Sequence, residues 1–493
     1  MLVASSGCRD HAEYMKFSRR HILKGARALA LGGVAGPTLL HAATPKALPD
    51  TLVAKPGVGE VMRGDAPLKV PFWGYNDHTP GPVLSVDQGA ELAMTLKNEL
   101  PQSTTIHWHG IRTPNDMDGV PYVTQKAVGR GMSFPYRFRC DDAGTFWYHP
   151  HANSAEQIGR GLYGALIVRE DKPLEVDREI VWVLSDLLIG KDGVVSEKFK
   201  SLGLNSHAGR LGNLVTVNGR HRPSVDVQPG ERLRLRLINA AAARIFSFDF
   251  TGLSGWWVAR DGQPVQPQPI DGEPVFIPPG GRADVVLDMP SSPAGDRKYE
   301  VFDATYRKRR FVVAAFRPAG KVLRTTGLAM PQKIADNPLA LPKLDGAELK
   351  TVSFEGGAMG GMQGAMLDGK KLEMPELVDN GILWATNGKA WSSLAEIARR
   401  GRLFNLELGK SYVLRLQNKT AFAHPIHLHG HTFQVISVGG KRMVNPPWRD
   451  TVLVFPKEHV DIAFVADNPG DWLLHCHILG HAMTGMMAAY RVG

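Results

Sequence analysis

The segment VDQGAELAMTLKN (residues 86–98) occurs twice more in altered form, as VQPGERLRLRLIN (227–239) and LELGKSYVLRLQN (406–418). Each copy places a Gly nine residues before an Asn, with apolar residues at alternate positions between them. Strict alternation after a turn-forming Gly is typical of a β-strand with one buried face. Because a repeat fixes both the fold and its register, the three copies predict three related β units.

A second landmark follows each copy, a Gly that begins an aromatic or apolar stretch. The three stretches are GTFWY (144–148), GDRKY (295–299) and GDWLL (470–474). Short strands separated by Gly and Pro, with little helical periodicity, favour antiparallel sandwiches. The chain of 493 residues also exceeds the usual size of one core and, at roughly 150 residues per domain, suggests about three. The sequence therefore predicts an all-β protein of three domains.

The domain boundaries are predicted near residues 172 and 335. The second boundary falls in a Pro-spaced stretch from Met330 to Pro342 that is typical of a linker. The predicted domains are residues 44–172, 173–335 and 336–493, and they follow a leader at residues 1–43.

The leader is predicted to be an export signal. SRRHILK (18–24) precedes a weakly apolar, Gly- and Ala-rich stretch (26–40), and together they resemble a twin-arginine signal, with Ile22 where such signals usually carry Phe. A basic membrane-surface helix or an anchor is the alternative, but the apolar stretch is too short and too rich in Gly to span a bilayer well. We expect export to the periplasm by the Tat translocase, and cleavage near Ala43.

Charge and cysteine content exclude two classes of protein. The formal charge is +10, but residues 1–43 carry six Lys/Arg against two Asp/Glu, so the remainder is only mildly basic. No run of Lys/Arg with interleaved aromatic residues argues for nucleic-acid binding. Of three cysteines, Cys8 lies in the leader, and Cys140 and Cys476 cannot form a disulfide framework. We predict that Cys140 is a buried structural thiol.

Four His-X-His pairs stand at matched places in the outer repeats, at 107–109, 149–151, 427–429 and 475–477. The central repeat has FDF (248–250) and EVF (300–302) at the corresponding places. Residues i and i+2 of a strand point to the same face, so each pair offers two imidazoles to one side. Eight imidazoles would converge if the outer domains pack together. They suit copper better than calcium or magnesium, which prefer oxygen ligands.

Cys476 lies between His475 and His477, so its sulfur must point to the opposite face and serve a different metal. His424 is an odd three residues before His427 and also faces away from its pair. His481 and Met486 follow the cysteine at five and ten residues. Two His, one Cys and a weak axial Met form the ligand set of a blue copper site. An electron at that site would need only the adjoining peptide bonds to reach two ligands of the other cluster.

The remaining histidines outside the leader have plainer interpretations. His431 continues the alternation after His429 and is either a strand residue or a group behind the ligands. His78 and His459 are expected at the surface or in packing. A lone His-X-His pair is weak evidence, but four matched pairs with a Cys inside one of them are highly specific.

These residues resemble the multicopper oxidase family of laccases, ascorbate oxidases and bacterial copper oxidases. The matching motifs are HWHG at 107, HPH at 149, HPIHLHG at 424 and HCHILGHAMTGMM at 475. The resemblance covers essentially the whole chain after the leader. It implies three cupredoxin-like Greek-key β-sandwich domains and four copper ions. It also implies an enzyme that couples one-electron oxidation of a donor to four-electron reduction of O2 to water.

The resemblance also implies a ligand set for each copper. The type 1 copper would be held by His424, Cys476, His481 and Met486. The type 2 copper would be held by His107 and His427. The type 3 pair would be held by His109, His149 and His477 on one ion and by His151, His429 and His475 on the other.

A carboxylate is expected near the oxygen-reducing cluster, because the reaction consumes protons. Asp118 stands where such oxidases carry that acid, eleven residues after His107. Its alternative role is a turn residue before Gly119. Many bacterial relatives carry a second acid directly after the His that corresponds to His481, but here the residue is Ala482.

The electron donor is left open by the sequence. Met359, Met362 and Met366 are soft ligands suited to Cu(I), and their spacing predicts that they share one helical face. The alternative is a flexible Gly-rich loop, with a phenol or an aromatic amine as donor. A non-catalytic copper-binding scaffold is disfavoured because relatives of that kind lose ligands, whereas this chain keeps all ten His, the Cys and the Met. A copper nitrite reductase is disfavoured because it would not need four His-X-His pairs. We expect a monomer with no stable membrane span.

Overall fold

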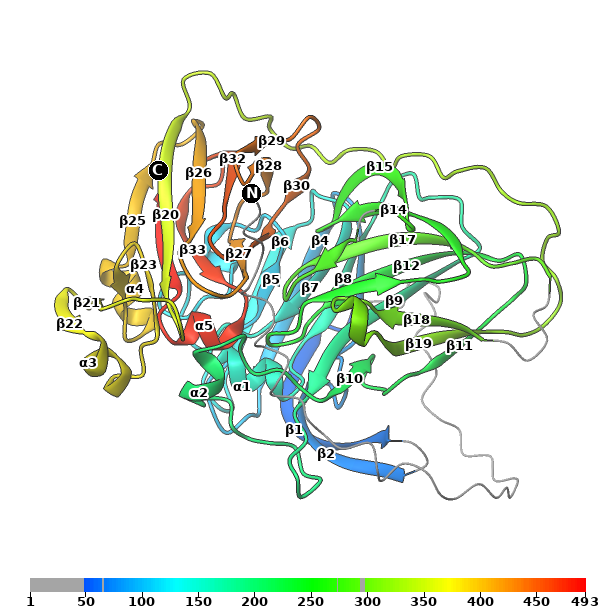
Figure 1. Cartoon of the computed structure of the whole chain (residues 1–493), viewed down its shortest axis with the longest axis horizontal. Helices are drawn as coiled ribbons and strands as arrows, with labels where there is room; N and C mark the ends of the chain where they lie inside the picture. The colour runs from blue at the N-terminus through cyan, green and yellow to red at the C-terminus, as the bar shows by residue number, and fades with distance from the viewer. Residues whose placement is uncertain (1–47, 64–65, 273, 293–297) are drawn as a thin grey trace, which may run out of the picture. The chain divides into compact units, whose positions relative to one another are not determined.

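A computed structural model of the chain describes residues 48–63, 66–272, 274–292 and 298–493 (Figure 1). All of them belong to one compact unit. The predicted export signal at residues 1–43 lies outside the described residues. Within these ranges, no helix has both the length and the apolar character needed to cross a bilayer.

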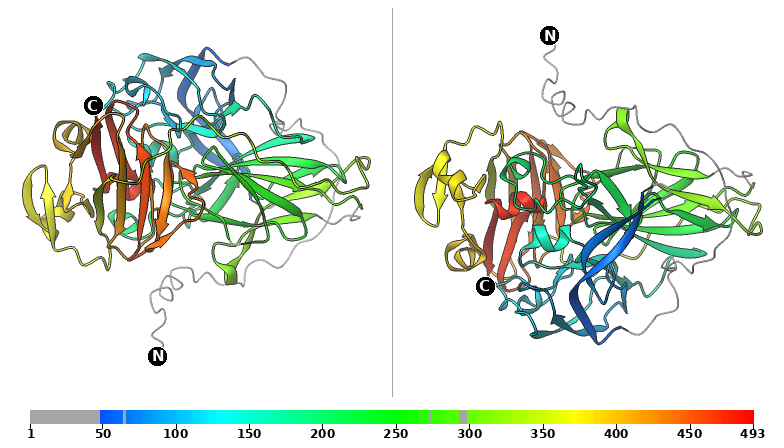
Figure 2. Two further views of the ribbon diagram at one scale, coloured as in Figure 1. Left: turned by 90° about the horizontal axis from the view of Figure 1, so that it is seen from above. Right: turned by 90° about the horizontal axis from the view of Figure 1, so that it is seen from below.

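The strands form three groups, and each group contains two sheets (Figure 2). In the first group the sheet orders are β2 (Ala66–Tyr75), β1 (Thr51–Arg63), β4 (Glu91–Asn98), β6 (Ser133–Arg139), and β3 (Leu84–Asp87), β8 (Gly164–Arg169), β7 (Gly144–His149), β5 (His107–His109). A 3-10 helix, η3 (Asn115–Met117), and the short helix α1 (Ser154–Gly159) lie in its loops.

The central group has a six-stranded and a five-stranded sheet. Their orders are β10 (Leu214–Val217), β9 (Arg178–Leu187), β12 (Arg232–Asn239), β17 (Arg282–Asp288), β14 (Ser254–Arg260), β15 (Gln263–Pro269), and β11 (Ser224–Val227), β19 (Phe311–Pro318), β18 (Tyr299–Asp303), β13 (Phe246–Asp249), β16 (Phe276–Ile277). Its short helical segments are α2 (Leu202–Asn205) and η4 (Arg307–Arg309). A strandless connection at 319–347 then leads to the third group (Figure 1).

The third group is the largest. One sheet runs β22 (Lys370–Glu373), β21 (Gly364–Leu367), β24 (Lys389–Ala390), β23 (Trp384–Thr386), β20 (Glu348–Gly356), β26 (Ser411–Asn418), β32 (His459–Val465), β28 (Phe433–Val438), β29 (Lys441–Arg442), and β30 (Trp448–Arg449) pairs with β28. The other runs β25 (Arg402–Leu406), β34 (Met487–Val492), β33 (Gly470–Cys476), β27 (His424–Leu428), β31 (Thr451–Val454). Its helices are α3 (Met374–Asp379), α4 (Leu394–Arg400) and α5 (Leu479–Met483).

The sequence repeat corresponds to a repeat in strand pairing. The repeated strands β4, β12 and β26 each lie parallel to an early strand of their group and antiparallel to a later one. The strand that follows each repeat, β5, β13 or β27, pairs antiparallel with the strand of the second landmark, β7, β18 or β33. The predictions of an all-β fold and of three related units are therefore confirmed.

The Asn that ends each repeat has the same buried task in all three groups. Its amide nitrogen donates to two backbone carbonyls, and its side-chain oxygen accepts from the backbone amide two residues later. Asn98, Asn239 and Asn418 are each at most 1% exposed. Buried backbone groups need such partners, so the Asn closes the loop that leads to the next strand.

One local prediction was wrong. Met359, Met362 and Met366 do not share a helical face, because Met359 lies in a turn at φ +61° and Met366 lies on β21. The physical reason is the five glycines between residues 356 and 364, since each Gly costs a helix roughly 1 kcal/mol relative to Ala. Cys140, in contrast, is a buried free thiol as predicted.

A buried ion cluster joins the first group of strands to the central group. Asp284 Oδ2 contacts Arg234 Nη2 at 2.7 Å and Arg236 Nη1 at 3.2 Å, and Thr145 of the first group donates its hydroxyl to Asp284 Oδ1 at 2.7 Å. Both arginine side chains are at most 1% exposed. Burial opposes ionisation of the neighbouring Glu170, but the two arginines hold the pKa of its carboxyl at about 2.

Replacing Asp284 should therefore be costly. We expect Asp284→Asn to lower the free energy of unfolding by about 3–5 kcal/mol, because it leaves two buried guanidinium groups undercompensated. Urea denaturation measures the loss. Arg317→Gln, which breaks an exposed bidentate pair with Asp226, is the control and should cost at most about 1 kcal/mol. Equal losses in the two variants would contradict this account.

Candidate metal centres

Eight histidines from the first and third groups converge in the interior. Strand pairing sets them opposite one another, with His107 of β5 across from His149 of β7 and His427 of β27 across from His475 of β33. Every one of the eight is at most 3% exposed. They are His107, His109, His149, His151, His427, His429, His475 and His477. All four predicted pairs are therefore brought together.

The ring nitrogens fall into groups in which all ligand atoms lie within 4.8 Å of one another. The histidine groups are His107 with His109 and His427, His109 with His149 and His477, and His151 with His429 and His475. In the last group His475 Nε2 lies 3.4 Å from His151 Nε2 and 3.1 Å from His429 Nε2. Each group combines side chains from the first and third groups of strands, so the site requires both.

The hydrogen bonds of these rings leave lone pairs free for a metal. His107 Nδ1 donates to the carbonyl of Asp118 and His427 Nδ1 to the carbonyl of Asp450, both at 2.8 Å. The opposite nitrogens, His107 Nε2 and His427 Nε2, have no hydrogen-bond partner among the described residues, nor does His109 Nδ1. An unpaired buried polar atom costs about 1–3 kcal/mol. A carbonyl partner that fixes the tautomer and leaves the other nitrogen as a lone pair is the usual arrangement around a metal-bound imidazole, so these residues fit copper.

Burial and mutual repulsion keep several of these rings neutral. Burial lowers the pKa of His109, His149 and His427 well below the usual range, and repulsion from neighbouring imidazoles lowers it further. Burial also lowers the pKa of His475 to about 4. At neutral pH the rings therefore offer lone pairs, as metal ligation requires.

A second site lies on the opposite face of β33. Cys476 Sγ is 3.6 Å from His424 Nδ1 and 3.7 Å from His481 Nδ1, and the two nitrogens are 3.1 Å apart. All three residues are fully buried, and Met486 is a fully buried member of the same hydrophobic cluster as Cys476. Burial raises the pKa of the Cys476 thiol, so a bound cation is needed to hold the thiolate.

The two sites are joined through one strand. His475 and His477 belong to the histidine groups, while Cys476 between them belongs to the second site. His475 Nδ1 also donates to the carbonyl of Cys476 at 2.9 Å. This hydrogen bond adds a link that the sequence did not reveal.

Asp118 lies where the sequence places it, at the end of η3 and against the histidines. Its carboxylate is 2.9 Å from His429 Nδ1 and 3.2 Å from His107 Nδ1. His107, Asp118 and His429 also form a possible metal group of their own. His107 and His429 each also belong to an all-histidine group. We therefore interpret Asp118 as a hydrogen-bond partner of these two candidate ligands and not as a ligand itself.

His431 is the group behind the ligands, and it does not lie in a strand. Its Nδ1 is 2.8 Å from the hydroxyl of Tyr490, which donates to the carbonyl of His429 at 2.7 Å. His78 is exposed and His459 is half-buried on β32, as expected.

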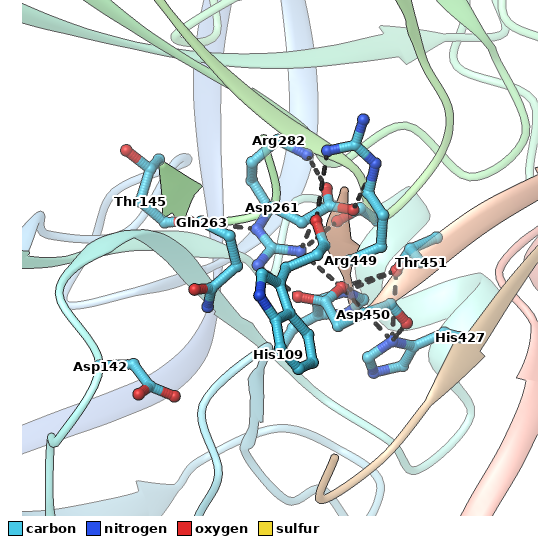
Figure 3. Close-up of polar contacts among 12 residues, drawn as sticks. His109, Asp142, Thr145, Asp261, Gln263, Arg282, His427, Arg449, Asp450 and Thr451 are labelled. Atoms are coloured by element: carbon cyan, nitrogen blue, oxygen red, sulfur yellow. Dashed lines mark hydrogen bonds and ion pairs between the residues drawn. The ribbon is translucent and has the colours of Figure 1, made fainter. Parts of the chain in front are cut away.

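Asp450 was missed by the sequence reasoning. Its Oδ1 lies 3.2 Å from His109 Nε2, and its carbonyl accepts from His427. Figure 3 shows it between these rings and Arg282. Asp450 stands outside every His-X-His motif, and only the pairing of β31 with β27 brings it to the site, so no sequence signal could have identified it.

Comparison with known proteins agrees with this geometry. Three family models, each described as multicopper oxidase, match residues 61–173, 178–315 and 372–493. Multicopper oxidase MmcO of Mycobacterium tuberculosis is 30% identical, with 96% of each chain covered. Copper resistance protein A of Escherichia coli is 26% identical, with 97% of this chain and 99% of that protein covered.

Solved structures give the same result. The multi-copper oxidase of Pseudomonas thermotolerans superimposes with a TM-score of 0.78 at 33% identity, covering 90% of this chain and 98% of that chain. A multicopper oxidase of Campylobacter jejuni, described as a metallo-oxidase, gives 0.72 at 27% identity, with 90% of both chains covered. The three groups of strands are cupredoxin-like domains. With its full-length relatives and its two converging sets of ligands, the chain belongs to the multicopper oxidases, a family of oxidoreductases.

Proposed function

We propose that the protein oxidises a reducing substrate one electron at a time at a type 1 copper and reduces O2 to water at a trinuclear copper cluster. The observation that carries the proposal is Cys476, the last residue of β33, which lies between two buried histidines of the other site. A scaffold that bound copper without turnover would not need this connection.

The proposal assigns twelve ligands to four copper ions. His424, Cys476, His481 and Met486 would hold the type 1 copper, and His107 and His427 the type 2 copper. His109, His149 and His477 would hold one type 3 ion, and His151, His429 and His475 the other. The free nitrogens of these rings and the groups within 4.8 Å support the assignment. When bound, the copper ions supply the one-electron steps and the binding of O2.

The chain provides the route for electrons between the two sites. From Cys476 Sγ the covalent path runs through the backbone to His475 or His477. A shorter branch crosses the hydrogen bond from His475 Nδ1 to the Cys476 carbonyl. These residues are buried, so water does not compete for the hydrogen bond between His475 and the Cys476 carbonyl.

Asp118 is proposed to deliver protons to the oxygen-reducing cluster. It is 1% exposed, and its carboxylate contacts two of the proposed ligands. The residue after His481, where a second acid would stand, is the buried Ala482. The proposal therefore depends on Asp118 alone among the acids predicted from the sequence.

The donor is proposed to be Cu(I) rather than a phenol. His481 Nε2, the outer edge of the type 1 site, donates to the carbonyl of His207 at 2.7 Å. The two preceding carbonyls are also bonded: that of Asn205 accepts from Trp384 Nε1 at 2.9 Å, and that of Ser206 accepts from the backbone amide of Ala358 at 2.7 Å. Residues 205–207 therefore cover the outer edge of the type 1 site. A phenol therefore cannot bond directly to the edge of His481. Electrons from a donor must cross the covering segment 205–207. This arrangement suits a compact metal ion bound on the outer side of that segment.

Of the three methionines, Met359 is best placed for such a donor. It directly follows Ala358, which is bonded to the covering segment, and it is 70% exposed. Met362 instead packs against a small hydrophobic cluster of the third domain. Thioether sulfur is a soft ligand that selects Cu(I).

Export by the twin-arginine route to the periplasm is also part of the proposal, as is a monomeric state. The leader motif at residues 18–24 supports the first. Cu(I) oxidation would be useful in that compartment.

Cys476→Ser should abolish both the blue absorption and oxygen uptake, because the hydroxyl cannot replace the thiolate, while three copper ions remain bound per chain. Visible absorption, copper analysis and an oxygen electrode measure these effects. Cys140→Ser, which changes the other buried thiol, should keep both properties. Blue absorption in Cys476→Ser would refute the type 1 assignment.

Asp118→Asn should lower oxygen consumption by about 10²-fold, the lower end of the contribution of a positioned acid. Reduction of the type 1 site by donor without oxygen, followed as bleaching of the blue band, should be unchanged. Asp116→Asn, an exposed acid in the same η3 segment, is the matched control. A proton-delivery role would be excluded by normal turnover in Asp118→Asn.

Met359→Ala should lower turnover of Cu(I) roughly tenfold, as expected for loss of about 1.4 kcal/mol of binding, and leave oxidation of a phenol unchanged. Met132→Ala removes a methionine that is similarly exposed, at 61%, and serves as control. Oxygen consumption with each donor is the measurement. A wild-type enzyme that prefers the phenol would contradict the assignment of Cu(I) as donor.

A further inference from the structure

The central domain reaches the histidine groups through Arg282, at the start of β17. Its guanidinium forms a bidentate pair with Asp450 of the third domain, Nη1 to Oδ1 at 2.7 Å and Nη2 to Oδ2 at 2.6 Å. The side chains of Arg282 and Asp450 are 0% and 3% exposed. Figure 3 shows the pair, with His427 on the side of Asp450 that faces away from Arg282.

Arg282 is fixed from the other domains as well as from its own. Its Nε donates to the carbonyl of Thr145 in the first domain at 3.2 Å, and its Nη1 donates to the carbonyl of Gly280 at 3.2 Å. Its backbone amide donates to Asp261 Oδ1 at 2.9 Å. The guanidinium thus has one orientation, and it presents a rigid fork to Asp450.

Asp450 transmits this orientation to two proposed ligands. Its Oδ1 lies 3.2 Å from His109 Nε2 and accepts the hydroxyl of Thr451 at 2.8 Å. The same Thr451 oxygen is 3.1 Å from His109 Nε2 and 3.2 Å from His427 Nδ1. The Asp450 carboxylate therefore contacts His109 directly and His427 through Thr451, while the Asp450 carbonyl accepts from His427 Nδ1 at 2.8 Å.

Two glycines keep the space for this arrangement. A Cβ on Gly110 would lie 2.3 Å from Arg282 Nη2 and 2.6 Å from Asp450 Oδ2. A Cβ on Gly280 would lie 2.8 Å from His477 Cδ2 and 2.9 Å from His109 Cε1. Both glycines have positive φ, at +89° and +84°. The Gly of the HWHG motif is thus explained by an ion pair from the other two domains.

We propose that Arg282 is a positioning residue of the oxygen-reducing centre. Through Asp450 and Thr451 it fixes the tautomer and the orientation of His109 and His427, so that His109 Nδ1 and His427 Nε2 face the metal site. The unpaired state of these two nitrogens agrees with this. The inference rests on the proposed function, because it assumes that these histidines bind copper.

A brace between domains is the competing explanation for the same ion pair. A brace would affect the stability of the chain, but it would not affect one copper site more than the other. The type 1 site has no hydrogen bond or ion pair with Arg282 or Asp450 among the described residues. The two explanations therefore differ in which spectroscopic signals change.

The test compares copper-loaded full chains of the wild type, Arg282→Gln, Arg282→Lys and Asp450→Asn. Arg232→Gln is the control, because Arg232 forms a bidentate pair with Asp288 within the central domain, although that pair is more exposed, at 7% and 22%. The readouts are copper bound per chain, blue absorption, the type 2 electron paramagnetic resonance spectrum, and near-ultraviolet absorption of the coupled pair. Chelator competition measures the affinity of the trinuclear site.

We expect Arg282→Gln to weaken copper binding at the trinuclear site about 10–100-fold, the usual effect of losing such a partner. Its type 2 spectrum should change while blue absorption stays normal. Arg282→Lys should be intermediate, because an ammonium group cannot form the fork, and Asp450→Asn should resemble Arg282→Gln. Arg232→Gln should change none of these signals.

Two results would overturn the inference: wild-type trinuclear signals in all three variants, or equal loss of both sites in these variants and in Arg232→Gln. If Arg282→Gln fails to fold, Arg282→Lys and Asp450→Asn decide the outcome by the same criteria. A wild-type chain that binds fewer than four copper ions would instead contradict the proposed function. The two failures are therefore distinguishable.

Discussion

Alternation of side chains along β33 is the constraint on which the rest of the structure depends. Neighbouring residues of a strand point to opposite faces, so Cys476 enters the core of its own domain while His475 and His477 leave it. The two histidines that point out of the domain can form a metal-binding group only if another domain places further ligands next to them. The first domain does so with His107 and His149, which its own strand pairing sets opposite each other. One strand thus contributes to both candidate metal sites, and this requires an interface between domains.

Burying eight imidazoles costs free energy of folding, because buried polar atoms lose their hydrogen bonds to water. Burial lowers the pKa of His109, His149, His427 and His475, so these rings are neutral. Backbone carbonyls accept hydrogen bonds from the Nδ1 atoms of several of the eight rings. Within the part of the chain that the structure describes, His107 Nε2 and His427 Nε2 have no hydrogen-bond partner. The ion cluster of Arg234, Arg236 and Asp284 joins the central domain to the first domain, which carries half of these histidines. Local rules are commonly violated at functional sites and compensated elsewhere.

The sequence was informative wherever a local pattern determines the geometry. The repeated Asn and the alternating strand predicted three β units, and period-two spacing predicted which histidines share a face. Spacing misled at Met359 to Met366, where glycines replaced the expected helix with a turn and a strand. Asp450 and Arg282 could not be found at all, because each reaches the histidines only through contacts between domains. Long-range pairing carries no signal in a single sequence.

The central domain has phenylalanines where its neighbours have histidines, and this difference clarifies its role. Phe248 and Phe250 are buried in its own interior, so β13 contributes packing instead of ligands. The domain nevertheless touches both sites at their outer edges. At the type 1 site the contact is made by His207, and at the histidine groups it is made by Arg282 through Asp450. The His207 carbonyl accepts directly from His481 Nε2. Arg282 instead binds Asp450, whose carboxylate contacts His109 Nε2. Both ring nitrogens face away from the proposed metal. The domain without His-X-His pairs therefore helps to orient the candidate ligands of the other two domains.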